Sequence, residues 1–281
     1  MKLKYLAAVL LIFGLIAGCA STGSHYEYGM QYYEAGRLDE AIEQFQASIA
    51  QYPSDPIVQK ALGDVFADKG LLLEAITQWE VALRLRPAYP EVQGKLEAAY
   101  LALGREEMDR GRIDDAMELW RRAIRLNPGN VEAHRRLGIA YANKGDNKAA
   151  IPELEFVVEK APTDELSYRR LGMAYFATGN LEAAARAFEA FVRIKPTDAM
   201  GYNNLGSVYI KMKKFDDAVH VLKQAVKLEP AEAAIYNNLG NAYFNKGDYK
   251  EARAQWAKVL ELKPMDKTAR ENLKVLETMG E

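Results

Sequence analysis

From residue 22 to residue 266, apolar and polar positions repeat with one period. Prolines recur at 34-residue intervals, with one interval of 41 residues, and positions seven, eleven and twenty-four of the period are almost always Leu or aromatic. Apolar residues at this spacing predict two amphipathic helices per period, whose apolar faces pack together and against the next pair. Counting back from the prolines gives seven units, at residues 22–55, 56–89, 97–130, 131–164, 165–198, 199–232 and 233–266.

Small residues occur at fixed places in every unit. Position eight is always Gly and position twenty is always Ala, which predicts a close crossing of the two helices because no bulky side chain separates them there. Position fifteen is Gly in six of the seven units, with Lys213 as the exception, and a left-handed residue at this place ends the first helix. Pro at position thirty-two ends the second helix, since it lacks an N–H and restricts the preceding residue.

This combination of residues resembles the tetratricopeptide repeat (TPR) and covers residues 22–266. The resemblance implies an all-α fold, a right-handed superhelical α-solenoid of seven helix pairs. Residues 267–281 follow the last unit, and Ala269, Leu273 and Leu276 lie on one side of the helix that they predict. We expect this segment to be a capping helix with a solvated outer face, because terminal repeats need a polar outer surface.

Seven additional residues, 90–96, precede the third unit and explain the longer interval. Pro90 suits the first turn of a helix, and Val92 and Leu96 continue the apolar stripe of the helix that follows. Seven residues make almost two helical turns, so the insertion extends the first helix by roughly 10 Å with little rotation of its apolar face. We expect the extension to protrude at one rim. Pro152, inside the second helix of the fourth unit, predicts a distorted first turn or a bend.

The N-terminus has the pattern of a signal peptide. Two lysines precede an apolar run from Tyr5 to Ala17, which is too short to span a bilayer, and Ile16-Ala17-Gly18-Cys19 resembles a lipobox. The resemblance implies that 1–18 is a lipoprotein signal peptide, and that Cys19 carries lipid and is joined to the repeats by a short linker, 19–23. Ala20 favours outer-membrane over inner-membrane delivery. A secretory signal with a buried free Cys and an uncleaved leader on a cytoplasmic adaptor stay open as alternatives.

Composition and motifs argue against other classes of function. Without Lys2 and Lys4 of the signal peptide, the 37 basic residues become 35 against 39 acidic ones, so no basic excess favours nucleic acid as a partner. The single Cys excludes an intrachain disulfide framework. His25 and His134 lie at a packing position of the repeat, and no two His have the spacing of a metal site. No nucleophile or phosphate-loop motif appears, so we expect no enzyme, cofactor or metal.

The resemblance places positions two, five, six, nine, twelve and thirteen of the first helices on a concave groove. Repeats four and five present arginine pairs there, which can grip carboxylates, and repeats six and seven present asparagines, which can pair with the main chain of an extended segment. The alternative is a solvated face whose arginines are neutralised by Glu132 and Glu165. The predicted partner-binding residues are Arg135, Arg136, Arg169, Arg170, Met173, Phe176, Asn203, Asn204, Asn237, Asn238, Asn241, Phe244 and Asn245.

Together these features predict a membrane-anchored, periplasm-facing scaffold that binds other proteins through extended or acidic segments. In architecture the chain is similar to the TPR lipoproteins of type IV pilus biogenesis, of the PilF/PilW type. The predicted role is assembly of pilus, secretion or cell-wall machinery in the bacterial envelope. A substrate-capture or regulatory subunit of a separately encoded envelope enzyme is the alternative, since a fold does not by itself determine a function.

Overall fold

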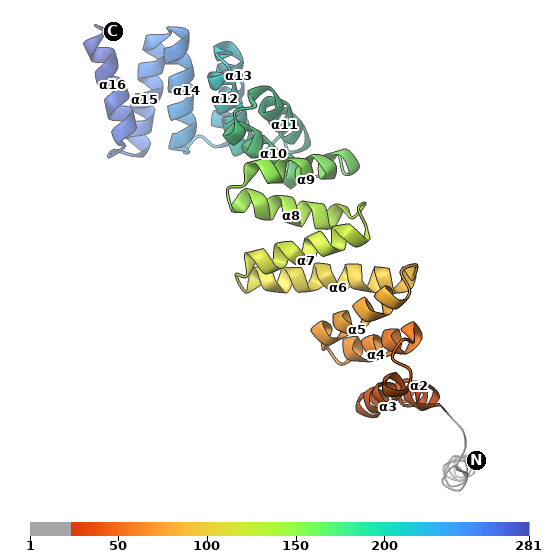
Figure 1. Ribbon diagram of the computed structural model, residues 1–281. Helices are drawn as coiled ribbons and strands as arrows, with labels where there is room; N and C mark the ends of the chain where they lie inside the picture. Colours follow the sequence, from red (N-terminus) through yellow and green to blue (C-terminus); the bar gives the residue numbers. More distant parts are fainter. Residues whose placement is uncertain (1–23, 281) are drawn as a thin grey trace, which may run out of the picture. The chain divides into compact units, whose positions relative to one another are not determined.

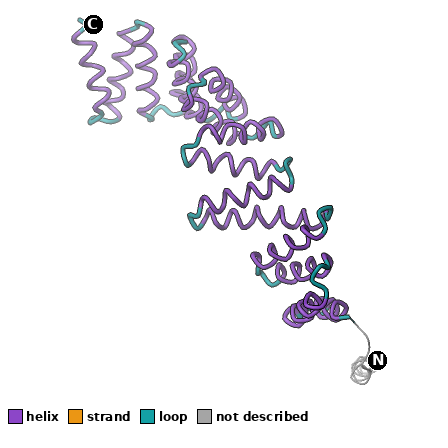
Figure 2. Tube along the Cα trace, in the orientation of Figure 1, coloured by secondary structure: helices purple, strands orange, loops and turns teal. Residues whose placement is uncertain are grey.

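The computed structural model describes residues 24–280, and this part of the chain contains helices and no strand (Figures 1 and 2). Seven helix pairs precede one terminal helix, which confirms the predicted all-α fold. The predicted signal peptide and Cys19 lie outside the described residues. The helices are α2 (His25–Glu34), α3 (Leu38–Gln51), α4 (Pro56–Asp68), α5 (Leu72–Leu85), α6 (Pro90–Asp109), α7 (Ile113–Leu126), α8 (Val131–Asn143), α9 (Asn147–Lys160), α10 (Glu165–Thr178), α11 (Leu181–Ile194), α12 (Ala199–Lys211), α13 (Phe215–Leu228), α14 (Ala233–Lys246), α15 (Tyr249–Leu262) and α16 (Lys267–Thr278).

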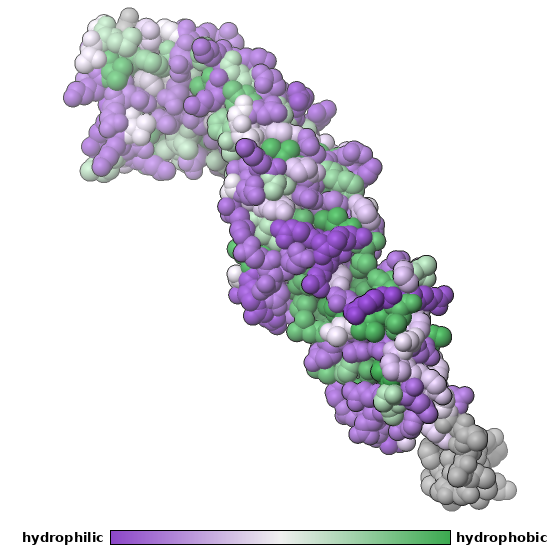
Figure 3. Space-filling model, viewed as in Figure 1, coloured by the Kyte–Doolittle hydropathy of each residue, from purple (hydrophilic) through white to green (hydrophobic). Residues whose placement is uncertain are grey.

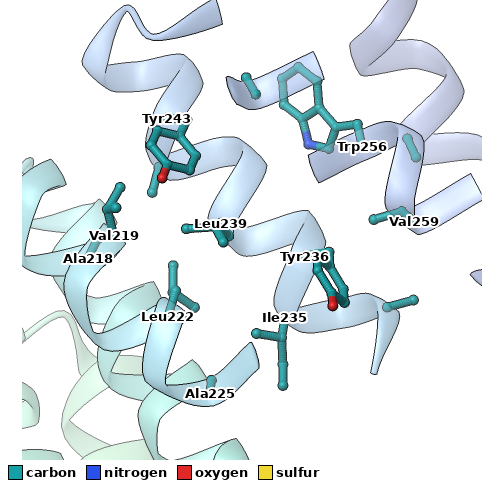
Figure 4. Close-up of a cluster of buried hydrophobic side chains, with 14 of the residues drawn as sticks. Ala218, Val219, Leu222, Ala225, Ile235, Tyr236, Leu239, Tyr243, Trp256 and Val259 are labelled. Carbon is teal, nitrogen blue, oxygen red and sulfur yellow. The ribbon is translucent and has the colours of Figure 1, made fainter. Parts of the chain in front are cut away.

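The chain divides into two compact units, and the boundary between them lies within α6. The first unit ends at Glu106 and the second begins at Glu107. Inside each unit, helices that follow one another in sequence pack together. First helices of neighbouring repeats also touch, as α2 does with α4, α8 with α10 and α12 with α14. The buried core therefore runs from repeat to repeat, as in the cluster of α12 to α16 around Leu222, Leu239 and Trp256 (Figure 4).

The turns and crossings have the predicted residues. Six glycines at position fifteen have φ between 72° and 91°, and Lys213 adopts the same left-handed conformation with φ 60°. At position eight, Gly makes room for the large side chain at position twenty-four of the same repeat. A Cβ on Gly240 would lie 2.4 Å from the indole nitrogen of Trp256, and one on Gly172 would lie 2.9 Å from the ring of Phe188. Small residues at the crossing thus let a bulky side chain fill the space between the helices.

The insertion at 90–96 does not protrude, contrary to our expectation. Val92 and Leu96 are 0% and 1% exposed, so one face of the first turns of α6 is buried, whereas Glu91 and Gly94 are exposed. Lys60 Nζ lies 2.7 Å from Glu91 Oε1, and Lys95 Nζ lies 3.1 Å from Asp64 Oδ1, so α4 and α6 are joined by ion pairs. Within the first unit, the start of α6 thus continues the 34-residue spacing of repeats one and two, as if the third repeat began at residue 90.

Two further expectations concern single helices. α9 runs without interruption from Asn147 to Lys160, so Pro152 does not break it. The outer side of α16 is solvated, as predicted for a capping helix, and Figure 3 shows hydrophilic residues over much of the C-terminal end of the chain. Its exposed charged residues are Lys267, Arg270, Glu271, Lys274 and Glu277.

Tyrosines at position eleven link successive repeats of the second unit. Each one meets the side chain at position twenty-five of the preceding repeat. The hydroxyl of Tyr175 donates to Glu155, and that of Tyr209 donates to Glu189 at 2.7 Å. Burial and then the bond to Glu155 raise the pKa of Tyr175 to about 12, and the same two causes, with Glu189, raise that of Tyr209. The other two pairs are Arg121 with Tyr141 and Lys223 with Tyr243.

These raised pKa values predict a loss of stability at alkaline pH. Because the hydroxyls titrate at higher pH in the folded chain than in the unfolded chain, their contribution is complete below about pH 10 and disappears as pH rises through about 12. Replacing both Tyr175 and Tyr209 by Phe should lower the free energy of unfolding by about 2 kcal/mol at pH 8, since each hydrogen bond contributes roughly 1 kcal/mol.

Urea unfolding at pH 8, 10 and 12, followed by circular dichroism, measures this effect. The difference between wild type and the double variant should be clearly smaller at pH 12 than at pH 8, because the hydroxyls begin to ionise in the folded chain. Tyr202→Phe is the matched control, because the described part of the chain shows no hydrogen bond from the hydroxyl of Tyr202. A difference that is as large at pH 12 as at pH 8 would show that the titrating hydroxyl protons do not carry the effect.

Candidate partner-binding groove

The predicted groove residues lie on the first helices of repeats four to seven, α8, α10, α12 and α14, all in the second unit. α8 touches α10 and α12 touches α14, so these helices present neighbouring surfaces. Most predicted residues are half-buried, and Met173 is 48% exposed. The structure separates them into residues that are engaged inside the protein and residues that are free to meet a partner.

The arginine pair on α8 is neutralised. Arg135 is ion-paired with both Glu132 and Asp164, and Arg136 Nε lies 2.6 Å from Glu132 Oε1. The alternative interpretation, in which neighbouring acids neutralise the arginines, therefore holds for this pair. Arg135 and Arg136 are thus engaged within the protein, and their role at a partner stays a prediction.

The arginine pair on α10 has a different environment. Glu165, which was expected to neutralise it, instead lies 3.1 Å from Lys195. Within residues 24–280, neither Arg169 nor Arg170 forms an ion pair. Nε of Arg170 is enclosed and has no hydrogen-bond partner there. A buried donor without a partner is costly, so an acceptor that reached this N–H would stabilise the folded chain.

An apolar hollow of about 330 Å³ lies between α10 and α12, next to this pair in sequence. Met173 and Phe176, both predicted, line it from α10, and Asn204 lines it from α12. Sequence reasoning missed Ala177, Phe188 and Ser207, which complete the lining. Ala177 and Ser207 occupy groove positions thirteen and nine, so the repeat pattern could have identified them, whereas Phe188 is a core residue of the second helix. We call this cavity the Met173 hollow.

Part of the asparagine ladder is hydrogen-bonded inside the protein, and its role at a partner stays a prediction. Asn203 is only 5% exposed, and its side-chain oxygen accepts from Asn238 Nδ2 at 2.8 Å. Asn241 Oδ1 lies 3.5 Å from Asn272 Nδ2, and Asn245 donates to the main-chain oxygen of Asn241 at 2.7 Å. These amides join successive repeats to one another. They are not a continuous row of free groups for a bound main chain.

The three remaining predicted residues, Phe244, Asn237 and Asn204, lie in different environments. The ring centroid of Phe244 lies 5.5 Å from that of Tyr249 and 5.7 Å from that of Trp256, so Phe244 packs onto the core. Asn237 Oδ1 is enclosed and lacks a partner among the described residues. Asn204 is half-buried at the Met173 hollow. In the described chain, the unpartnered polar groups of the groove therefore lie on α10, α12 and α14.

The histidines and acids do not assemble a metal centre in the part of the chain that the structure describes. The ring of His134 contacts Glu153 at 2.5 Å and the carbonyl oxygen of Pro128 at 3.0 Å, as a packing residue does. His220 is exposed. Within residues 24–280, the groove offers two unpaired arginines, an apolar hollow and the amide of Asn204.

Comparisons with known proteins agree with the fold. Residues 88–279 match the model of the C-terminal domain of cilia and flagella-associated protein 70, which is a TPR domain, and residues 26–90 match that of the tetratricopeptide repeat. No curated protein matches the chain. The crystal structure of MamA protein is 28% identical, with a TM-score of 0.58 over 61% of this chain and 93% of that one.

Two further solved structures are similar. MamA from Desulfovibrio magneticus RS-1, from residue 41 to its end, is 26% identical, with a TM-score of 0.57 over 61% of this chain and 97% of that one. The C-terminal part of a TPR protein from Cytophaga hutchinsonii shares the fold at 20% identity, with a TM-score of 0.52 over 88% and 99% of the two chains. The chain therefore belongs to the family of this ciliary C-terminal domain, which is a tetratricopeptide repeat family, and such repeats generally mediate protein–protein interactions and are typically not enzymes.

Proposed function

We propose that this protein is a membrane-anchored, periplasm-facing scaffold that holds an extended segment of another protein in the groove of α8, α10, α12 and α14. The observation that carries the proposal is the enclosed, unpartnered Nε of Arg170 on the helix that also lines the Met173 hollow. A concave, mostly apolar site with a few polar groups is the usual form of a binding pocket.

The chemistry of the groove defines the segment that it fits. An apolar side chain of the partner fills the hollow against Met173 and Phe176. A carboxylate close to it in the partner's sequence accepts from Arg169 and Arg170, because an arginine grips a carboxylate with two hydrogen bonds. The amide of Asn204 meets the partner's main chain, since it carries both a donor and an acceptor. The bound segment thus carries an apolar side chain and, close to it in sequence, an acidic one.

Membrane anchoring is the second part of the proposal and rests on residues 1–23. The lipobox-like Ile16-Ala17-Gly18-Cys19 supports lipidation of Cys19, and two or more acyl chains anchor a protein stably. Within residues 24–280, no helix has both the length and the apolar content that crossing a bilayer requires. Labelling of cells with a palmitate analogue should mark the wild-type chain and not Cys19→Ala. Equal labelling of both chains would contradict the anchor.

The architecture is similar to that of the PilF/PilW-type lipoproteins, which supports a role in envelope assembly, with the outer membrane as the favoured location because of Ala20. The proteins recovered with the lipidated chain decide the pathway. Pilus or secretion-channel components support the scaffold. Recovery of a glycosyltransferase or a cell-wall hydrolase alone would instead identify a subunit that presents substrate to that enzyme.

Met173→Lys should reduce recovery of the partner at least ten-fold. The side chain is 48% exposed, so the folded chain tolerates the lysine, but a bound partner would bury its charge next to Arg169 and Arg170. Met265→Lys is the matched control, because Met265 is 77% exposed in the turn before α16. Quantitative pull-down with circular dichroism measures both. Equal recovery with the two variants would eliminate the hollow as the binding site.

A further inference from the structure

A second hollow, of about 480 Å³, opens between α13, α14 and α15 and shares no residue with the groove. We call it the outer hollow. It belongs to the layer formed by repeats six and seven, where Tyr243 of α14 meets Lys223 of α13. Its floor is apolar and its polar lining contains no carboxylate. The polar groups are His220, Lys223, Gln224, Lys227, Tyr243 and Gln255.

The same place in neighbouring layers contains a carboxylate. A hollow between α9, α10 and α11 is lined by Glu155 and Tyr175, and the tyrosine hydroxyl donates to that glutamate. One layer further, Tyr209 donates to Glu189 at 2.7 Å. Glu155, Glu189 and Lys223 all occupy position twenty-five of their repeats. The sixth repeat therefore has a cation where the two repeats before it have the acceptor for the next tyrosine.

With a lysine at position twenty-five of the sixth repeat, polar groups of this layer lack partners among the described residues. Tyr243 is only 7% exposed, and within the described residues its hydroxyl has no hydrogen bond. Lys223 Nζ lies 5.7 Å from the ring centroid of Tyr243, and no ion pair is present at Lys223, Lys227 or His220 in residues 24–280. Tyr243 lines an open hollow that Lys223 and Lys227 also line.

Other layers balance their cations. In the third repeat, Glu118 lies at position twenty-two, 2.9 Å from Arg125 and 3.3 Å from Arg121. His220 takes that position in the sixth repeat. Of positions twenty-two, twenty-five and twenty-nine, at least one is acidic in repeats three, four and five, and none is acidic in repeat six. The concentration of positive charge is thus specific to one layer.

We propose that the outer hollow binds a carboxylate from an acidic segment of a partner protein, which occupies the place that Glu155 and Glu189 occupy in their own layers. The hydroxyl of Tyr243 and the ammonium groups of Lys223 and Lys227 donate to it, and charge-assisted bonds of this kind are the stronger ones. The site is separate from the groove, so the scaffold can contact two protein segments at once.

Fluorescein-labelled hexaglutamate is the probe, and its anisotropy is measured with the full chain in neutral detergent at low salt. Lys223→Glu is the decisive variant, because it places a carboxylate inside the hollow and restores the pattern of the neighbouring repeats. We expect it to weaken binding at least ten-fold without loss of helicity. Tyr243→Phe should weaken binding about five-fold, since it removes one hydrogen bond to a charged group.

Three controls make the result specific. Lys274→Glu changes the net charge equally at an exposed position of α16 and should bind as wild type does. The double variant Arg169→Ala, Arg170→Ala removes the free cations of the groove and should also retain the binding that Lys223→Glu loses. Inorganic phosphate and vesicles of phosphatidylglycerol should compete weakly, because the neighbouring layers hold carboxylates.

The proposal is overturned if hexaglutamate does not bind the wild-type chain, or if Lys223→Glu binds as wild type does. It is also overturned if Lys274→Glu or the groove variant loses binding to the same extent, which would indicate unspecific attraction or binding in the groove. If phosphate or the vesicles bind tightly and the peptide does not, the ligand of the outer hollow is a phosphate-bearing molecule and not an acidic protein segment. Failure of the groove proposal changes none of these outcomes.

Discussion

Replacing Gly240 by alanine should destabilise the C-terminal repeats by about 2 kcal/mol. The added Cβ would lie 2.4, 2.7 and 2.9 Å from three ring atoms of Trp256, which is 2% exposed and cannot move away without disturbing the core. Overpacking costs roughly 1–3 kcal/mol, and contacts this short belong at the upper end, so the cost exceeds the gain of about 1 kcal/mol that alanine brings to a helix. Urea unfolding measures the effect, together with hydrogen exchange of α14 and α15.

Gly94→Ala is the matched control and should change the free energy of unfolding in the opposite direction. Gly94 lies within α6, and a Cβ there would meet no atom within 4 Å. Only the helix propensity changes, so this variant should be more stable by about 1 kcal/mol. Two stabilised variants would show that the crossing at position eight has room for a side chain, and would contradict the packing inferred for every repeat.

Replacing Asp64 by alanine should destabilise the first unit by about 3 kcal/mol. The carboxylate is 11% exposed and is surrounded by Lys60 and Lys95, each with Nζ at 3.1 Å. It also accepts from the indole nitrogen of Trp79 at 2.9 Å. Removal leaves the ammonium group of Lys95 and the buried N–H of Trp79 without their acceptor, whereas Lys60 keeps its ion pair with Glu91. Losing one member of a buried pair costs roughly 3–5 kcal/mol, and we expect the lower end of this range. Urea unfolding of the full chain, with hydrogen exchange of α4 and α6, measures it.

Asp39→Ala removes a carboxylate that is equally ion-paired but 76% exposed, next to Lys69. An exposed pair contributes at most about 1 kcal/mol, so this control should change stability little. If the two variants lost the same amount of stability, the ion pairs between α4 and the start of α6 would contribute no more than exposed pairs do. The insertion would then not be docked in the way that the buried Val92 and Leu96 indicate.

The fold could be predicted because each repeated residue type acts on its immediate neighbours in the same repeat. Gly at position eight admits a bulky residue at position twenty-four, and glycines at position fifteen take φ values that other residues rarely adopt. Lys213 shows that the turn can also form without glycine. Residues 90–96 lengthen the first helix of the third repeat and continue its buried apolar stripe, as expected, and only the expected protrusion was misjudged, because the units were counted back from the prolines. Counting forward from residue 22 in steps of 34 reaches residue 90, where α6 begins.

The site was only partly predictable, since equivalent positions have different neighbours. Arg135 and Arg169 occupy the same place in successive repeats, yet Asp164 and Glu132 engage the first, whereas Glu165 turns to Lys195 and leaves the second free. A pattern of residue types does not show which acid reaches which arginine. For the same reason the asparagines were assigned to a partner, although Asn203 and Asn238 bond to each other across two repeats.

Binding of a partner segment at the Met173 hollow is most directly tested by site-specific photocrosslinking in the native envelope. A benzoylphenylalanine at Ala177, which is exposed and lines the hollow, should crosslink the lipidated chain to one discrete protein. The same group at Ala254, exposed on α15, should not yield that product. Absence of a crosslink from Ala177, or the same product from both positions, would contradict a partner in the groove.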